Sequence, residues 1–156
     1  MRNNIAMLLA FCSGLMACNH ELSGREKMLA SNLERYLQEV CRVDVNKDQL
    51  YYVIPMLGCD NCINNHLHML KNQISTTVNV TVIFSGKIVK KSWLADVEAI
   101  KTKYNNVILD KDDRASIYDF GLLKPVVAEK KNNQWIYYNL VKDAGMQQLV
   151  AYMNQR

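Results

Sequence analysis

Two cysteines two residues apart are the feature of this sequence that most plainly allows chemistry. The Cys59-x-x-Cys62 pair stands between an apolar run that ends at Leu57 and a helical pattern that starts near Ile63. At such a strand-to-helix junction the first thiol lies at the helix N-terminus, where unpaired backbone N–H groups and the helix dipole stabilise a thiolate. The two thiols can close into a disulfide and reopen, so the spacing predicts a dithiol redox site.

Metal binding is the alternative chemistry for the same cysteines. In zinc-binding proteins the spacing usually recurs, and this chain has no second C-x-x-C. His66 falls on the same helix face, so a copper site made by Cys59, Cys62 and His66 stays open as an alternative. However, Cys59 and His66 are about 10 Å apart along a regular helix, too far to share one ion without a distorted first turn. We therefore expect no metal or other cofactor, and interpret His66 as a partly buried helix residue.

The N-terminus predicts where the protein works. Arg2 is followed by an apolar stretch, residues 5–17, which is too short to span a bilayer stably and has the form of a secretion signal. The stretch ends in Leu-Met-Ala before Cys18, which resembles the lipobox of bacterial lipoproteins. This resemblance implies cleavage before Cys18 and lipidation of that cysteine. Ordinary secretory cleavage at the same point and an uncleaved anchor are the alternatives.

Lipidation would decide both the compartment and the tether. Several acyl chains on Cys18 would hold the protein to a membrane surface without a transmembrane helix, and disulfides persist outside the cytoplasm. We therefore interpret residues 1–17 as a lipoprotein signal peptide and residues 18–22 as a tether. The expected location is the cell envelope, as a membrane-anchored lipoprotein that faces the periplasm.

Length and charge limit the remaining possibilities. The chain has 156 residues, which without the signal peptide suffices for one domain with a proper core and not for two ordinary domains. Its net charge is +4, and the basic residues are scattered rather than interleaved with aromatic residues in a stripe. We therefore do not expect nucleic acid as a partner.

Hydrophobic periodicity predicts that strands and helices alternate after a first helix. Ser23 and Glu26 have the spacing of a capping box at the start of that helix, which should end near Cys41. The later elements are expected as a strand at 51–55, a helix from 63 to 74, a strand at 78–84 with alternating apolar residues, a helix capped by Ser92, a strand at 106–110, a short helix at 113–120 closed by Gly121, hairpin strands at 126–129 and 135–140 joined by an Asn132-Asn133 turn, and a closing helix that carries residues 146–153.

Three of these features together resemble the thioredoxin-like family over about residues 48–154. A strand runs into the Cys59-x-x-Cys62 pair and a helix, Pro125 directly precedes a hairpin strand, and the hairpin is followed by a terminal helix. With its lipoprotein start, the chain looks like the membrane-tethered thioredoxins of bacterial envelopes. The resemblance implies an α/β, thioredoxin-like fold with a central mixed sheet flanked by helices. Residues 48–156 would form that domain, and residues 23–47 an N-terminal helical extension.

The resemblance also implies a mechanism. The Cys59 thiolate would attack a partner disulfide, and Cys62 would resolve the mixed disulfide. In that family a cis-proline packs across from the two cysteines, and Pro125 maps onto it. The partners would be protein thiols and disulfides of the envelope, with an upstream electron donor. A redox-inert binding module of the same fold and a metal-handling lipoprotein are the alternatives.

Departures from the family bear on the direction of the reaction. Members often have Gly-Pro between the cysteines and a buried acid six residues before the first, where this chain has Asp60-Asn61 and Val53. The charge of Asp60 should raise the pKa of the thiols and favour the reducing direction. Lys124, just before the proline, is expected to oppose that effect by standing near Cys59.

Cys41 is the thiol left over after the lipidation site and the redox pair. We interpret it as a small, buried residue at a helix end, because unpaired cysteine packs well in cores. A regulatory or intermolecular cysteine is the alternative.

Overall fold

A computed structural model of the chain describes residues 22–132, 134–139 and 143–155. The predicted signal peptide, Cys18 and the tether up to residue 21 lie outside the described residues. So do Asn133 of the predicted hairpin turn and Leu140, where its second strand was expected to end. In the part that is described, no helix is both long and apolar enough to cross a membrane.

Helices and strands alternate along the chain, as the periodicity predicted. They are α1 (Gly24–Glu39), β1 (Gln49–Pro55), α2 (Asp60–Asn72), β2 (Val80–Ser85), α3 (Lys91–Lys103), β3 (Asn106–Asp110), the short 3₁₀ helix η1 (Arg114–Ile117), β4 (Val126–Lys131), β5 (Gln134–Asn139) and α4 (Asp143–Asn154). The strands form one sheet in the order β3-β2-β1-β4-β5. The expected α/β class, with a mixed sheet, flanking helices and an additional N-terminal helix, is confirmed.

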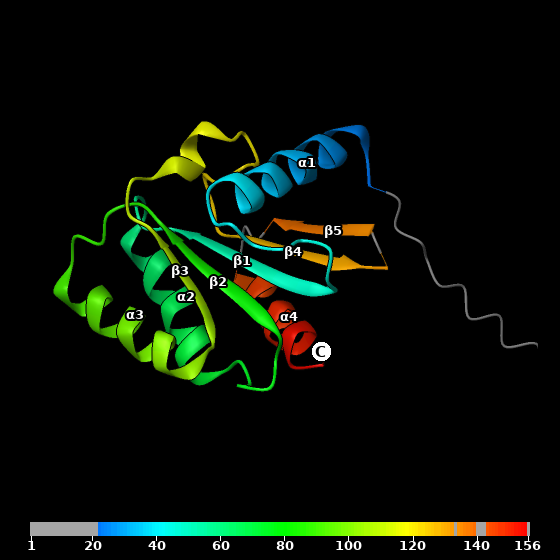
Figure 1. Cartoon of the computed structure of the whole chain (residues 1–156). Coiled ribbons are helices and arrows are strands. Elements are labelled where there is room, and N and C mark those ends of the chain that lie inside the picture. The colour runs from blue at the N-terminus through cyan, green and yellow to red at the C-terminus, as the bar shows by residue number, and fades with distance from the viewer. Residues whose placement is uncertain (1–21, 133, 140–142, 156) are drawn as a thin grey trace, which may run out of the picture.

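The central strand β1 joins the parallel half of the sheet to the antiparallel half. It is parallel to β2, with Leu50 opposite Val80, and antiparallel to β4, with Val53 opposite Val126. The two crossovers, from β1 to β2 and from β2 to β3, step in the same direction along the sheet. Because such crossovers are right-handed, they place α2 and α3 on one face, where the two helices lie side by side below the sheet in Figure 1.

Alternate residues of β1 belong to two separate apolar clusters, one on each face of the sheet. Tyr52 and Ile54 pack with residues of α2, α3 and α4, whereas Tyr51 and Val53 pack with residues of α1 and of the segment after β3. Figure 1 shows α1 above the sheet and the other three helices below it. Both faces are thus covered by elements within residues 22–155, so this part of the chain contains a core of its own.

Helix α1 starts where the capping box predicted. The Ser23 backbone N–H donates to the Glu26 carboxylate over 2.8 Å, and the Glu26 N–H donates to the Ser23 hydroxyl over 3.4 Å. The helix buries Leu29, Leu33 and Leu37, among others, against the sheet. Residues 23–47, expected as an extension, therefore cover one face of the sheet together with the segment after β3.

Three local predictions were wrong in detail. Helix α3 begins at Lys91 with Lys90 as its N-cap, so Ser92 is not the cap. The short helix after β3 is only the single turn η1, because Asp113 before it is left-handed with φ 53° and Tyr118 after it is extended with ψ 108°. Gly121 has a positive φ of 85° but lies in the loop beyond that turn. Strand β2 is buried along its whole length, because it lies between β1 and β3 and both sheet faces are covered.

Candidate redox site

Cys59 stands at the junction that its sequence context predicted. The chain leaves β1 at Pro55, and Cys59 is the N-cap of α2, where its carbonyl accepts the first helical hydrogen bond from the Ile63 N–H over 3.1 Å. Cys62 lies in the first turn of the same helix. Both thiols are exposed, so a partner molecule has access to either sulfur.

The surroundings of Cys59 favour its thiolate. Hydrogen bonds from the Cys62 thiol, then from the backbone N–H of Cys62 and that of Asn61, lower the pKa of the Cys59 thiol. Slight burial and the charge of Asp60 act in the opposite direction. These are the opposing effects expected of a helix N-terminus and of an acidic neighbour. The net result is a thiol that ionises more readily than an ordinary cysteine.

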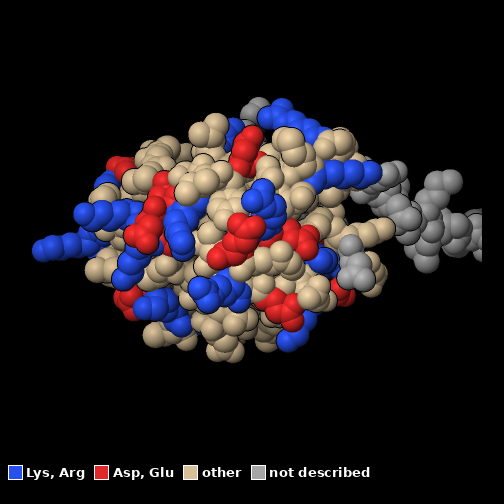
Figure 2. All heavy atoms as spheres, turned by 45° about the horizontal axis from the view of Figure 1, so that its top comes forward, with Lys and Arg blue, Asp and Glu red and all other residues tan. Residues whose placement is uncertain are grey.

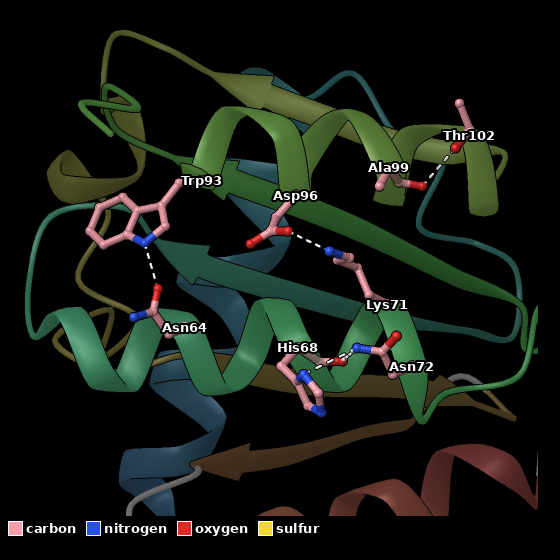
Figure 3. A network of polar contacts seen from close by, with 8 residues as sticks. All are labelled: Asn64, His68, Lys71, Asn72, Trp93, Asp96, Ala99 and Thr102. Carbon is pink, nitrogen blue, oxygen red and sulfur yellow. Dashed lines mark hydrogen bonds and ion pairs between the residues drawn. The ribbon is translucent and has the colours of Figure 1, made fainter. Parts of the chain in front are cut away.

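A lysine that sequence reasoning missed pairs with Asp60. The Lys90 ammonium donates a hydrogen bond to the Asp60 carboxylate and lies 4.7 Å from the centre of the Trp93 ring. The Trp93 indole N–H in turn donates to Asn64 Oδ1 over 2.7 Å, as Figure 3 shows. These contacts join the first turns of α2 to the start of α3.

The expected opposition of Lys124 to the charge of Asp60 stays a prediction. The Lys124 side chain is exposed, and it is not among the described groups that shift the pKa of Cys59. Lys90 is the cation that forms an ion pair with Asp60. No local pattern marks it, because it is 30 residues away along the chain and only the packing of α3 on α2 brings it there.

Pro125 lies at the same edge of the sheet as Cys59. It is buried and directly precedes β4, which runs antiparallel to β1, so the start of β4 is next to the end of β1. All peptide bonds in the described ranges are trans. The cis arrangement implied by the family resemblance is therefore absent at Pro125. The two isomers of an X–Pro bond differ by only about 0.5–1 kcal/mol, so the residue type alone does not decide between them.

His66 points toward the sheet, whereas the two cysteines are exposed to solvent. Its side chain is 6% exposed, its Nδ1 is hydrogen-bonded to the Tyr52 hydroxyl of β1, and the two rings meet edge to face at 5.8 Å. Burial lowers the pKa of His66 to about 4, so the imidazole is neutral at neutral pH. The interpretation of His66 as a buried helix residue is confirmed.

The three residues of the metal alternative are not assembled into a site. Within the described ranges, no group of three or more His, Cys, Asp or Glu side chains is placed to hold a metal ion. Cys59 and Cys62 are exposed at the helix start, whereas the His66 ring lies beneath the helix against Tyr52. Cys59 and His66 are seven residues, about two helical turns, apart along α2, as the helical rise suggested.

A buried carboxylate organises the loop that leads toward Pro125. Asp110, the last residue of β3, accepts hydrogen bonds from the Tyr36 and Ser85 hydroxyls over 3.1 and 3.2 Å. It also accepts from the backbone N–H groups of Arg114 and Ala115 over 3.1 and 2.9 Å. Sequence reasoning missed this cluster. An acidic residue at the end of an apolar strand, followed directly by a turn, was the available signal.

Cys41 is a partly buried residue just after the end of α1, close to the interpretation made from its sequence. Its N–H donates to the Tyr36 carbonyl over 3.2 Å. Desolvation raises the pKa of the Cys41 thiol to about 11, with a further contribution from the charge of Asp110 and an opposing hydrogen bond from the Tyr36 hydroxyl. The thiol is therefore un-ionised at neutral pH.

A largely apolar groove includes Leu57, which precedes Cys59 by two residues. It has a volume of about 510 Å³ and is lined by residues of α1, of the end of β1 and of the loop from Asp113 to Leu123. Leu57 is 56% exposed in it, and Met28 and Leu123 are exposed as well. The groove offers space for apolar side chains of a bound polypeptide, and Leu57 joins it along the chain to Cys59.

The molecular face that includes α1 carries charges of both signs. In Figure 2, basic and acidic side chains are interspersed over this face, with tan surface between them. The charge pattern there gives no extended region of a single sign.

The chain was also compared with known proteins. No protein-family model matches it, and no curated protein or solved structure does.

Proposed function

We propose that this protein is a thioredoxin-like thiol–disulfide oxidoreductase of the bacterial cell envelope. The observation that carries the proposal is the placement of Cys59 and Cys62. Two exposed thiols lie at the start of the helix that follows the central strand, and hydrogen bonds lower the pKa of the first. An exposed, readily ionised thiol with a second thiol one helical turn away is the arrangement that disulfide exchange requires.

The arrangement of the strands supports the same family. A parallel β1-α2-β2 unit, an antiparallel β4-β5 hairpin and a terminal helix on one mixed sheet are compatible with a thioredoxin-like fold. Pro125 at the sheet edge of Cys59 agrees with it too. The chain departs from the family in the trans peptide bond before Pro125 and in the apolar Val53 at the place of a buried acid. Because Val53 cannot accept a proton, the proton of Cys62 passes to solvent.

The proposed reaction transfers two electrons to the partner. The Cys59 thiolate attacks one sulfur of a partner disulfide, which breaks that bond, forms a mixed disulfide and releases the other partner sulfur as a thiolate. Cys62 then loses its proton and attacks Cys59. This step closes the Cys59–Cys62 disulfide and releases the second partner thiolate. Both released thiolates take protons from solvent, and a dithiol donor must return two electrons to the protein.

The envelope location rests on the sequence. A lipidated Cys18 would anchor the protein to a membrane surface, facing the periplasm, where its substrates would be protein disulfides. The groove lined by Leu57, Met28 and Leu123 supports a polypeptide substrate, because it presents several exposed apolar side chains and Leu57 is only two residues from Cys59.

The test is the reduction of insulin by the chain from Asn19 onward, with dithiothreitol as electron source. This part of the chain includes the complete core described above. We expect turnover above the dithiothreitol background, its loss in Cys59→Ser and Cys62→Ser, and its retention in Cys41→Ser. Activity that is equal in the wild-type protein and both active-site variants would contradict the proposal and favour a redox-inert binding module.

A further inference from the structure

Asp60 poses an electrostatic problem for the redox site. It directly follows Cys59, and its carboxylate is 56% exposed at the start of α2. A negative charge at this position opposes the thiolate that the exchange reaction uses. The same charge disfavours the reduced, anionic form of the pair relative to the neutral disulfide.

Lys90 is held where it counteracts that charge. Its ammonium is hydrogen-bonded to the Asp60 carboxylate and lies over the Trp93 ring at 4.7 Å. A second contact between the two helices, from Lys71 to Asp96 over 2.5 Å, fixes α3 against α2 further along, as Figure 3 shows. The lysine is therefore positioned by the packing of two helices and not by its own flexible side chain alone.

Three other ionisable groups, on α2 and on the strand beneath it, carry no compensating charge. His66, on the buried side of the helix, is neutral, because burial lowers its pKa to about 4. Tyr52, which faces it from β1, is likewise neutral, because burial raises its pKa well above the ordinary value. Cys62 donates its thiol hydrogen to Cys59. Among the described residues, the cation shown to meet Asp60 is Lys90.

We propose that Lys90 is a positioning residue that sets the reduction potential of the Cys59–Cys62 pair by neutralising Asp60. The inference rests on the proposed function and deepens it. Reduction of the disulfide takes two electrons from a dithiol donor and, while Cys59 stays a thiolate, one proton at Cys62. Lys90 stabilises this anionic product. Its removal makes the protein a stronger reductant with a less ionised Cys59, and removal of Asp60 has the opposite effect.

The test compares the wild-type chain from Asn19 onward with Lys90→Met, Asp60→Asn, the double variant and Lys91→Met. Lys91 is the neighbouring exposed lysine, so its variant is the control for an equal loss of charge. Two readouts are used: the pH dependence of iodoacetamide alkylation at Cys59, and the oxidised fraction of the pair in dithiothreitol redox buffers, both followed by mass spectrometry. Neither needs a protein substrate or turnover, so a failure of the proposed function leaves both readable.

We expect Lys90→Met to slow alkylation of Cys59 at neutral pH by about two- to fivefold, and to shift the redox equilibrium toward the disulfide by a similar factor, since an exposed ion pair is weak. Asp60→Asn should shift both in the other direction, and the double variant should return toward wild type. Equal effects of Lys90→Met and Lys91→Met would overturn the proposal. So would a Lys90→Met variant that loses turnover while both readouts stay at their wild-type values.

Discussion

Cys59 and Cys41 carry the same thiol in opposite surroundings. Cys59 is exposed at the start of α2, and hydrogen bonds from the thiol and backbone of Cys62 lower its pKa. Cys41 is partly buried after the end of α1, where desolvation and the charge of Asp110 raise its pKa to about 11. Placement relative to a helix end and to solvent, and not residue type, therefore decides which of these two thiols ionises more readily.

The largest expected effect is a difference in alkylation between the two thiols. At neutral pH, Cys41 should react with iodoacetamide at least about a hundredfold more slowly than Cys59, because each pKa unit changes the thiolate fraction tenfold. Peptide mass spectrometry of the reduced protein over a time course measures both rates in one sample. Similar rates in the folded protein would break the comparison, and equal rates in urea are the expected control.

A second prediction concerns the pH dependence of stability that the buried imidazole of His66 causes. Burial lowers the pKa of His66 from 6.5 to about 4, so between these values the unfolded chain binds a proton that the folded chain does not. Its contribution to stability is therefore complete above about pH 6.5 and falls as the pH approaches 4, by about 3 kcal/mol.

Urea unfolding at several pH values between 7.5 and 4 measures this dependence. The His66→Gln variant should lack that part of the pH slope, although it is less stable at neutral pH. His68→Gln is the matched control, because His68 lies on the exposed side of the same helix. An unchanged slope in His66→Gln would show that other groups cause the acid sensitivity.

A third prediction is that loss of the Asp110 charge brings the alkylation rate of Cys41 closer to that of Cys59. Asp110→Asn removes a buried charge that raises the pKa of Cys41, so alkylation of Cys41 should become faster. The variant also disturbs four hydrogen bonds and should lower the free energy of unfolding by about 1–3 kcal/mol. Asp112→Asn, a change at an exposed neighbour, should alter neither quantity.

The smallest expected effect concerns access to Cys59. Leu57→Ser removes an apolar side chain from the groove two residues from Cys59 and should raise the KM for insulin about three- to tenfold, the effect of losing partial burial of one apolar side chain. The rate with a small aromatic disulfide should stay the same. Leu94→Ser alters a leucine of α3 that is 49% exposed, close to the 56% of Leu57, and is the control. An equal effect on both substrates would mean that the variant perturbs the thiol itself.

Much of the fold could be predicted, because its signals are local. The period of apolar residues predicted the element order, the Ser23 and Glu26 pair predicted the start of α1, and the switch from strand to helix placed Cys59 at a helix N-terminus. Each of these follows from residues within a few positions of one another, since helical and strand periods involve near neighbours. The errors at Ser92 and at 113–120 concern element ends, which depend on packing as well.

The sequence by itself thus determined which thiols stand at a helix start, and the tertiary structure decided what surrounds them. Lys90 meets Asp60, Tyr52 meets His66, and Asp110 meets Tyr36, at separations of 30, 14 and 74 residues. No periodic pattern encodes such pairs, because they form only through the strand order of the sheet and the packing of each helix on one of its faces. Lys124 was expected near the site because it directly precedes Pro125 in sequence, whereas Lys90 pairs with Asp60 only through the packing of α3 on α2.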